Sequence, residues 1–286
     1  MLRLAIATCL KYPNLLAPYD DLTPLLAAEG IEAHLLPWDD PAVDWSGFDA
    51  AVLIGAWGYH RRMAEFLDWL GRLEDCGTVV LNSPDLIRWN SRKTYLRELA
   101  ERGIRVVPTV FVEPGEQIRL HDILTDRNWP QAVLKPAISA GADDTARISL
   151  AEADAHQPNL ATILTYGPAM IQPFMPEVSA GEWSLYYFAG ELSHTVVKRP
   201  VAGDYRVQHD FGGTVEALDP PTWLRDQAEA ALAALPESPL YARIDGLCRD
   251  RDFYLMEAEL IEPYLYLEYS EPAPKRFVGA LAGRLR

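Results

Sequence analysis

The chain of 286 residues is 49% hydrophobic and 23% charged, which is typical of a folded protein and excludes a disordered one. Its 41 Asp and Glu against 26 Lys and Arg give a net charge of -15. That balance argues against binding to a nucleic-acid backbone and against docking on an anionic membrane. A small anionic ligand stays compatible with the sequence, because a local cluster of Lys and Arg can hold it. The length indicates roughly two domains, or one large domain.

The cysteines and the N-terminus bear on the compartment. Cys9, Cys76 and Cys248 are odd in number and widely spaced, and no CxxC occurs, so neither a disulfide framework nor a zinc site is expected. The apolar start of the chain ends at Lys11 and Pro13, which is too early for a signal peptide and predicts a buried first strand. No apolar run approaches the ~20 residues that span a bilayer. The sequence predicts a cytoplasmic protein.

The first 84 residues predict a small parallel α/β unit. Apolar stretches alternate with segments whose large apolar residues recur at helical spacing, and this alternation favours a parallel sheet. A domain boundary is expected near Asn82-Ser83-Pro84. The predicted strands are 2–8, 50–57 and 78–81, and the predicted helices are 20–28 and 61–75.

The rest of the chain is rich in strands and predicts a mainly antiparallel α+β arrangement. Two helices are expected, one that Asn90 or Ser91 caps and that ends at Gly103, and one at 223–235. Residues 136–145 (PAISAGADDT) predict a mobile loop, and residues 189–191 predict a hairpin turn. The predicted strands are 105–112, 131–135, 169–172, 184–188, 192–197, 241–245 and 253–257.

Basic residues supply candidate phosphate ligands. Lys135 ends a strand beside the flexible loop, where its ammonium and free N–H groups suit a phosphate. Lys93 is expected in the first turn of its helix, where the helix dipole and the ammonium together attract an anion. A plain surface lysine is the alternative at both positions. Further cations suit a transferring phosphoryl group or a substrate carboxylate, with surface ion pairs as the alternative; they are Lys198, Arg199, Arg206 and Arg243.

The stretch 170–177 (MIQPFMPE) leaves a predicted strand and turns at two prolines. Each proline lacks an N–H, so neighbouring backbone groups stay free to bond a flat heterocycle. Glu177 is then expected near a sugar hydroxyl. An ordinary strand exit is the alternative interpretation.

Three carboxylates form a candidate metal site. Asp245 ends one predicted strand, and Glu257 and Glu259 lie two residues apart on another, so these two side chains share a face. Like charges on one face repel unless a cation joins them, and carboxylates together with phosphate oxygens suit Mg²⁺ or Mn²⁺. A solvated acidic strand end is the alternative. Glu262 and Glu268 are weaker candidates nearby.

Neither GxxxxGK[ST] nor GxGxxG occurs, so two common nucleotide-binding fingerprints are absent. The ordered set of motifs nevertheless resembles the ATP-grasp superfamily over nearly the whole chain. Bacterial glutathione synthetase and the cyclo-ligase that makes D-cycloserine from O-ureidoserine look similar. The motifs are Lys93, VLKP at 133–136, IQPFMPEV at 171–178, KRP at 198–200, DYRVQHDFGG at 204–213, RID at 243–245 and MEAELIEP at 256–263.

The resemblance implies a fold of three parts. A parallel α/β pre-ATP-grasp domain would span residues 1–84, a central α+β subdomain with the mobile loop residues 85–172, and a C-terminal α+β subdomain residues 173–286. ATP would be clamped between the last two parts.

The resemblance also assigns roles by matching position. The ATP phosphates would contact Lys93 and Lys135, and magnesium would be held by Asp245, Glu257 and Glu259. The remaining assignments are Gln172, Phe174 and Met175 to the adenine edge, Glu177 to the ribose, and Arg206 with Lys198 and Arg243 to the phosphoryl group in transfer.

The activity implied is that of an ATP-dependent carboxylate–amine ligase. A small amino-acid-like substrate would form an acyl phosphate that an amine attacks, with release of ADP and phosphate, while the loop at 136–145 closes as a lid. The alternatives are an intramolecular cyclo-ligase of a ureido amino acid and a nucleotide-binding protein without turnover. Related enzymes imply a homodimer or a homotetramer.

Two positions depart from the family pattern. Glu259 stands where glutathione-synthetase-like enzymes usually carry Asn, and Gly58 stands where the similar cyclo-ligases carry Asp between Trp and Tyr. A substrate cleft is expected around this segment, with plain packing as the alternative; its candidate residues are Trp57, Tyr59, His60 and Arg61.

Overall fold

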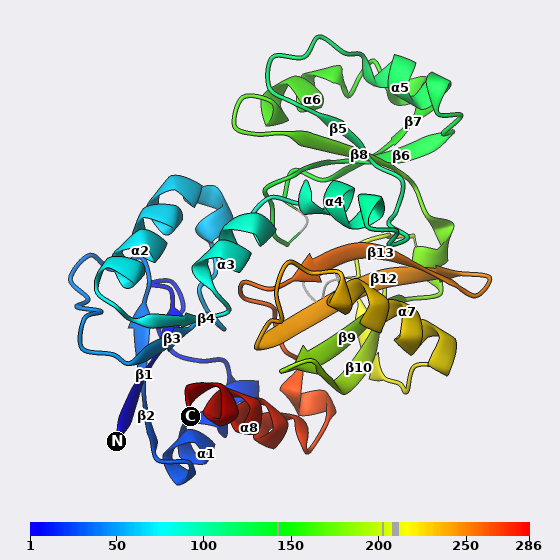
Figure 1. The fold of residues 1–286 in the computed structure, drawn as a ribbon. Helices are drawn as coiled ribbons and strands as arrows, with labels where there is room; N and C mark the ends of the chain where they lie inside the picture. Colours follow the sequence, from blue (N-terminus) through cyan, green and yellow to red (C-terminus); the bar gives the residue numbers. More distant parts are fainter. Residues whose placement is uncertain (142, 202, 208–211) are drawn as a thin grey trace.

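The computed structural model describes residues 1–141, 143–201, 203–207 and 212–286. Ala142 of the predicted loop and residues 208–211 of the predicted motif at 204–213 lie outside the described residues. Three sheets and the helices that cover them make up the described fold (Figure 1). No helix among these residues has the length and apolar character to cross a membrane.

The N-terminal sheet is parallel, as predicted, with the strand order β2-β1-β3-β4. Its strand β2 was not predicted, because only the first residue of this edge strand is buried and its sequence shows no clear alternation. The strand predicted at 50–57 is only three residues long. The elements are β1 (Leu2–Thr8), α1 (Leu22–Ala28), β2 (Ile31–Pro37), β3 (Ala50–Val52), α2 (Met63–Asp75) and β4 (Val79–Leu81).

The single helix predicted from Asn90 or Ser91 to Gly103 is wrong. Two helices occupy this region, α3 (Pro84–Asn90) and α4 (Tyr95–Glu101). The hydroxyl of Ser83 caps α3 by accepting a hydrogen bond from the N–H of Leu86, at 3.1 Å. Lys93 therefore lies in the turn before α4 and not in the first turn of a helix.

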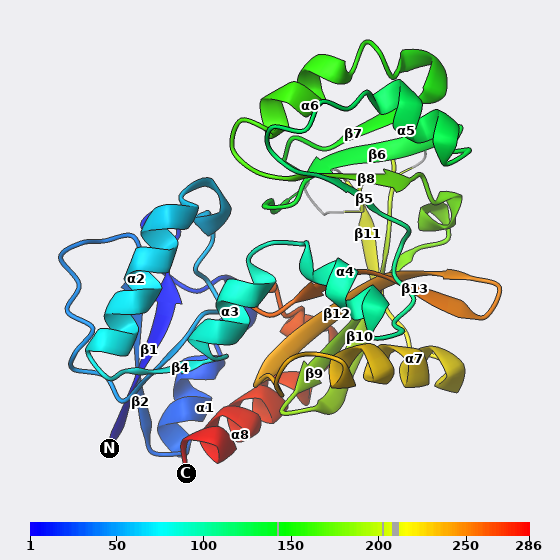
Figure 2. The same ribbon diagram turned by 45° about the horizontal axis from the view of Figure 1, so that its top comes forward.

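The central sheet is antiparallel, with the order β5-β8-β6-β7. Helices α5 and α6 cover its outer face and share a separate hydrophobic core with it, while its other face looks toward the C-terminal sheet (Figure 2). The strand β7 and both helices were not predicted, and the strand predicted at 105–112 is confined to β5. The elements are β5 (Val110–Val112), α5 (Leu120–Asp126), β6 (Gln131–Pro136), β7 (Ala146–Ser149), α6 (Gln157–Ile163) and β8 (Ala169–Pro173).

The C-terminal sheet is antiparallel, as predicted, with the order β11-β10-β9-β12-β13. The predicted hairpin turn joins β9 to β10 through Ala189 and Gly190, whose φ angles of 48° and 87° are those of a tight hairpin turn. The elements are β9 (Glu182–Phe188), β10 (Glu191–Arg199), β11 (Thr214–Ala217), α7 (Thr222–Ala233), β12 (Tyr241–Arg249) and β13 (Asp252–Glu259).

The last helix, α8 (Ala273–Leu285), was not predicted, and it brings the C-terminal end of the chain into contact with the N-terminal part. It packs between α1 and the C-terminal sheet, so that one hydrophobic core holds Leu4 and Ile6 of the N-terminal sheet together with Phe188 and Phe277. The N-terminal and C-terminal sheets are therefore fixed to one another. The division into 1–84, 85–172 and 173–286 stays a prediction.

A β-bulge in β13 sets which side chains face the site. Asp245 pairs with Glu257 and the next residue, Gly246, pairs with Leu255, so Met256 is an extra residue. The extra residue changes the alternation: Phe253 and Leu255 lie in the core under α7, whereas Glu257 and Glu259 face the opposite side.

Gly246→Ala should destabilise the fold at this bulge. A Cβ at position 246 would lie 2.6 Å from the carbonyl oxygen of Tyr254 and against the ring of Phe253. We expect the free energy of unfolding in urea to fall by about 1–3 kcal/mol, as for an overpacked core. Gly279→Ala is the matched control, because a Cβ there has open space on an exposed part of α8 and should raise stability by up to about 1 kcal/mol. Equal effects of the two substitutions would contradict the packing argument.

Candidate active site

A cavity of about 840 Å³ lies where the three parts of the chain meet, and it is lined by all but one of the residues to which the family resemblance assigns a role. Among the described residues its lining holds eight Lys and Arg against seven Asp and Glu. The cavity is thus not acidic, although the whole chain carries a charge of -15. A cavity of this size and composition suits an anionic small molecule.

One face of the C-terminal sheet carries a network of paired charges at the floor of the cavity. Alternate residues of β9, β10 and β12 point there, because side chains two apart on a strand share a face. Lys198 Nζ lies 2.6 Å from Glu182 Oε1 and 3.6 Å from Asp245 Oδ1. Although burial lowers the pKa of Lys198, Asp245 and Glu182 raise it above its usual value, so the ammonium stays charged.

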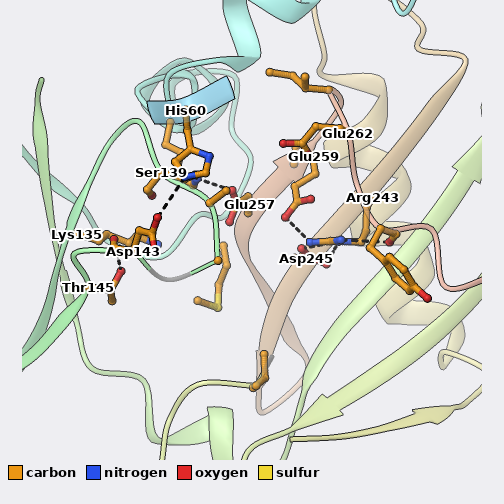
Figure 3. A pocket seen from close by; sticks show the side chains of 18 of the residues that line it. His60, Lys135, Ser139, Asp143, Thr145, Arg243, Asp245, Glu257, Glu259 and Glu262 are labelled. Atoms are coloured by element: carbon orange, nitrogen blue, oxygen red, sulfur yellow. Dashed lines mark hydrogen bonds and ion pairs between the residues drawn. The ribbon is translucent and has the colours of Figure 1, made fainter. Parts of the chain in front are cut away.

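Arg243 joins two of the predicted metal ligands (Figure 3). Its Nε lies 2.9 Å from Asp245 Oδ2, its second terminal nitrogen pairs with Glu259, and its first donates to the carbonyl of Tyr264 at 3.2 Å. Burial alone would raise the pKa of Asp245, but Arg243 and Lys198 hold it below its usual value. Ser184 donates a further hydrogen bond to Asp245.

Glu257 and Glu259 face the cavity from β13, as the spacing predicts, and their side chains are each 27% exposed against 4% for Asp245. Burial raises the pKa of Glu259 to about 7, with Arg243 opposing the rise and Glu257 adding to it. Glu257 pairs with Lys93, whose Nζ lies 2.7 Å from Glu257 Oε1 and donates to the carbonyl of Ser139 at 2.6 Å.

The donor set fits a divalent cation only in part. No group of three or more His, Cys, Asp or Glu side chains in the described part of the chain is arranged to hold a metal ion. Two carboxylates that open onto a cavity with cations are nevertheless what Mg²⁺ uses when substrate phosphates and water complete its shell. The residues therefore suit a cation that arrives with phosphate, and they form no closed protein cage.

Lys135 differs from the other lysines of the cavity. It projects from β6, and its ammonium makes no ion pair or hydrogen bond with any residue that the structure describes. Burial lowers its pKa, and Lys93 adds to this, while Glu257 and Glu182 act against it. A partly buried lysine with no protein partner has a free binding position for an anion.

One end of the cavity is apolar and lies between the central and C-terminal sheets. Met175 belongs to a small cluster there, and its N–H makes no hydrogen bond with the described residues. The side chain of Gln172 is fixed by donating to Thr109 Oγ1 at 2.8 Å. Phe174 stacks under the guanidinium of Arg147, 3.6 Å from the ring centre. The buried members of the cluster are Val107, Met175, Val178, Val207 and Leu247.

Glu177 has a role assigned by the resemblance but lies outside the lining, as do the candidates Arg199 and Glu268. Glu177 is the second residue of the short helix η4 (Pro176–Ser179), and its Oε1 lies 2.5 Å from Nε of Arg249. This pair lowers the pKa of Glu177 below its usual value. Arg206 lines the cavity and pairs with Asp204 at 2.8 Å.

The N-terminal domain closes the other end of the cavity. The predicted cleft residues Trp57, Tyr59, His60 and Arg61 all line it, the last three on the short helix η2 (Tyr59–Arg61). Their contact with the loop at 136–145 was not predicted. Asp143 of the loop accepts from Arg61 Nε at 3.0 Å and lies 3.2 Å from His60 Nε2.

Sequence reasoning missed Glu182 and Ser184 as site residues. Both stand at alternate positions of β9 (EWSLYYF), where the neighbouring residues are large and apolar. Polar residues that recur every second position in such a strand indicate a charged inner face, and this signal was available.

Comparisons with known proteins agree along the chain. The profile of the D-cycloserine synthetase DcsG N-terminal domain matches residues 4–82. Cycloserine biosynthesis protein DcsG of Streptomyces lavendulae is 33% identical, with 93% of this chain and 94% of that protein covered. Glutathione synthetase of Prochlorococcus marinus (strain MIT 9313) is 25% identical, with 88% and 74% covered.

Solved structures give the same result. The crystal structure of D-cycloserine synthetase DcsG matches with a TM-score of 0.89 and 32% identity, covering 99% of this chain and 100% of that one. The D-alanine–D-alanine ligase of Bacillus anthracis matches with a TM-score of 0.69 over 98% of this chain and 95% of that one. Its identity is 17%, so that likeness shows the fold alone.

Replacing Lys135 and Lys93 should separate a binding lysine from a structural one. Lys135→Met removes an ammonium that has no partner among the described residues, so we expect an unchanged or slightly higher free energy of unfolding. Lys93→Met leaves Glu257 without its cation and should lower the free energy of unfolding by about 1–3 kcal/mol. Urea unfolding followed by tryptophan fluorescence compares the two. A larger loss for Lys135→Met would give Lys135 a structural role.

Proposed function

Because the chain belongs to the family of ATP-grasp ligases that includes D-cycloserine synthetase DcsG, we propose that it joins the carboxyl group of a small amino-acid-like substrate to an amine. It is an ATP-dependent ligase that forms carbon–nitrogen bonds. The ATP-grasp resemblance predicted from the ordered motifs is confirmed.

The order of environments along one cavity supports this proposal most directly. An apolar end between two sheets, a middle that gathers most of the cations, and an aromatic end under the N-terminal domain follow one another. A nucleotide needs the first two environments, and a second substrate needs space beside the terminal phosphate. The cavity offers all three.

The adenine would lie in the apolar end. The free N–H of Met175 and the fixed amide of Gln172 would meet its polar edge, and Phe174 would cover it. We still assign Glu177 a bond to the ribose. In the structure its carboxylate is paired with Arg249 and does not line the cavity. That bond therefore requires Glu177 to turn toward the cavity.

The phosphates would lie in the middle of the cavity. Lys135 would contact them directly, and Lys93 would do so in competition with Glu257 and Ser139. Glu257 and Glu259, with Asp245 behind them, would hold Mg²⁺ or Mn²⁺. Such a cation supplies neutralisation of phosphate charge when it is bound.

Catalysis would depend mainly on positioning and charge neutralisation. A carboxylate oxygen of the substrate attacks the γ-phosphorus, the bond to the bridging oxygen breaks, and ADP leaves. The amine nitrogen then attacks the acyl carbon, phosphate leaves, and the nitrogen loses a proton. We assign stabilisation of the phosphoryl group in transfer to Arg206, with Lys198 and Arg243 fixed below it by their ion pairs.

Water would hydrolyse the acyl phosphate, so the active site must exclude water during the reaction. The loop at 136–145 lines the cavity, and it is held from both sides. Lys93 donates to its Ser139 carbonyl, and Arg61 and His60 hold Asp143. These contacts support its proposed role as a lid.

The first test is ADP release from Mg-ATP with a panel of amino acids and dipeptides, each with and without added amine. We expect at least one acid to stimulate ADP release only when an amine is present. Nucleotide binding with no stimulated release for any pair would favour the binding protein without turnover and would contradict the proposal.

An intramolecular cyclo-ligase is the second candidate. The identity of 33% to cycloserine biosynthesis protein DcsG over 93% of this chain favours it. O-ureidoserine without amine belongs in the panel for this reason. Turnover of that single substrate would identify the cyclo-ligase.

Glu257→Gln should abolish ADP formation while the fold stays intact. The amide keeps the shape of the side chain but removes the charge that a cation and Lys93 require. We expect a loss of at least about 100-fold in kcat, with an unchanged circular dichroism spectrum. Glu216→Gln, an exposed carboxylate paired with Arg199 outside the cavity, is the control. Turnover retained in Glu257→Gln would contradict the assignment of Glu257 as a ligand of the divalent cation.

A cytoplasmic location and a homodimer or homotetramer also stay proposals. The first is supported by the spacing of the cysteines, and the second by the resemblance to the family.

A further inference from the structure

Glu262 is a carboxylate at the aromatic end of the cavity that the proposed chemistry does not use. It lies on the segment that leaves β13 and passes under the N-terminal domain, and it lines the cavity. Figure 3 shows it next to Glu259 among the labelled residues of the cavity.

The backbone around Glu262 is held on both sides. Before it, the N–H of Leu260 donates to Asn90 at 3.0 Å, and the carbonyl of Leu260 accepts from Asn82 at 2.7 Å. After it, the N–H of Leu265 donates to the hydroxyl of Tyr19 at 2.7 Å. These three partners are buried side chains, so the position of Glu262 is fixed.

The carboxylate of Glu262 makes no ion pair or hydrogen bond with any residue that the structure describes. The two cations near it are committed elsewhere: Lys93 to Glu257, and Arg243 to Asp245 and Glu259. Burial raises the pKa of Glu262 well above its usual range, Glu259 adds to the rise, and Arg243 and Lys93 only partly oppose it. An arriving cation would relieve this cost and hold the ionised form.

The surroundings suit an organic cation. The rings of Trp57, Tyr59, Tyr264 and Tyr266 line the same cavity, and aromatic faces attract an ammonium group. A cavity that is lined by both a carboxylate and aromatic rings can bind a primary ammonium by charge and shape together.

We propose that Glu262 receives the cationic amino group of the substrate and so restricts this ligase to acids that carry one. This inference rests on the proposed function. The amino group would anchor the substrate at the N-terminal end of the cavity, with its carboxylate toward the phosphates at the middle. Glu262 is a specificity-determining residue in this account and takes no part in bond making.

The test compares acids that differ only in the amino group. ADP release from Mg-ATP is measured with alanine, serine and O-ureidoserine and with their deamino counterparts propionate, 3-hydroxypropionate and 3-(ureidooxy)propionate, each with and without added amine. We expect the native enzyme to respond to at least one amino acid and to prefer it at least about 100-fold in kcat/KM over its counterpart. Response to the deamino acids instead would refute the inference and leave the proposed function standing. Response to neither set would contradict both.

Glu262→Gln should reduce that preference. We expect KM for the amino acid to rise about 10- to 100-fold with kcat within a few-fold, and kcat/KM for the deamino acid to stay unchanged. Glu216→Gln is the control, because Glu216 is exposed, pairs with Arg199 and lies outside the lining.

Other outcomes separate the competing roles of Glu262. An equal loss for amino and deamino acids would indicate a structural role, and it should come with a lower urea midpoint. A loss in kcat alone would indicate a proton acceptor. Either result overturns the inference.

Discussion

The site depends on charges that are buried in pairs on one face of the C-terminal sheet. Lys198 pairs with Glu182, Arg243 with Asp245 and Glu259, and Lys93 with Glu257, and the cation of each pair is largely buried. Burying such a pair adds little to stability, whereas removing one partner leaves an uncompensated charge and is costly. The network therefore behaves as a unit. It keeps a set of cations in place before any phosphate arrives, which is the preorganisation that phosphoryl transfer requires. Lys135 and Glu262 stand outside the network, and each offers a ligand a group that no described residue pairs.

The bulge at Met256 makes that network possible. In a regular strand Phe253, Leu255 and Glu257 would share one face, and the carboxylate would then be directed into the hydrophobic core under α7. The extra residue moves Glu257 and Glu259 to the side of Arg243 and Asp245 on β12. Gly246 lies opposite the extra residue because no side chain fits between it and Phe253. A local irregularity of one residue thus decides whether the sheet has an acidic face.

Sequence reasoning succeeded where the signal was local. Residues two apart on a strand share a face, so Glu257 and Glu259 were correctly placed together, and composition correctly predicted the hairpin turn and a loop between β6 and β7. It failed where distant residues decide the outcome. The partner of Glu177 is Arg249, 72 residues later, and no pattern near Glu177 indicates it. Asn90 was predicted as a possible helix cap, but its side chain hydrogen-bonds the backbone of Ala258 and Leu260, about 170 residues later in the chain. The cavity lining combines segments that are spread along the chain from Cys9 to Tyr266, and only the fold brings them together.

The two ends of the cavity differ in how firmly they are held. The N-terminal and C-terminal sheets share one core through α8, so the end with Tyr59 and Glu262 lies between parts that cannot move independently. Most buried residues of the central sheet form a core of their own, whereas Ala137 and Met170 pack in the core of the C-terminal sheet. The apolar end of the cavity lies between these two sheets. Such an arrangement permits the central sheet to shift against the rest, as in hinge closure. Lys93 is placed between these regions, because its N–H donates to Ala137 and its ammonium to Ser139 of the loop, while it also pairs with Glu257. A phosphate that binds Lys93 must compete with Ser139 and Glu257. In the proposed function, nucleotide binding would thereby be coupled to the position of the loop, while the proposed substrate end would keep its shape.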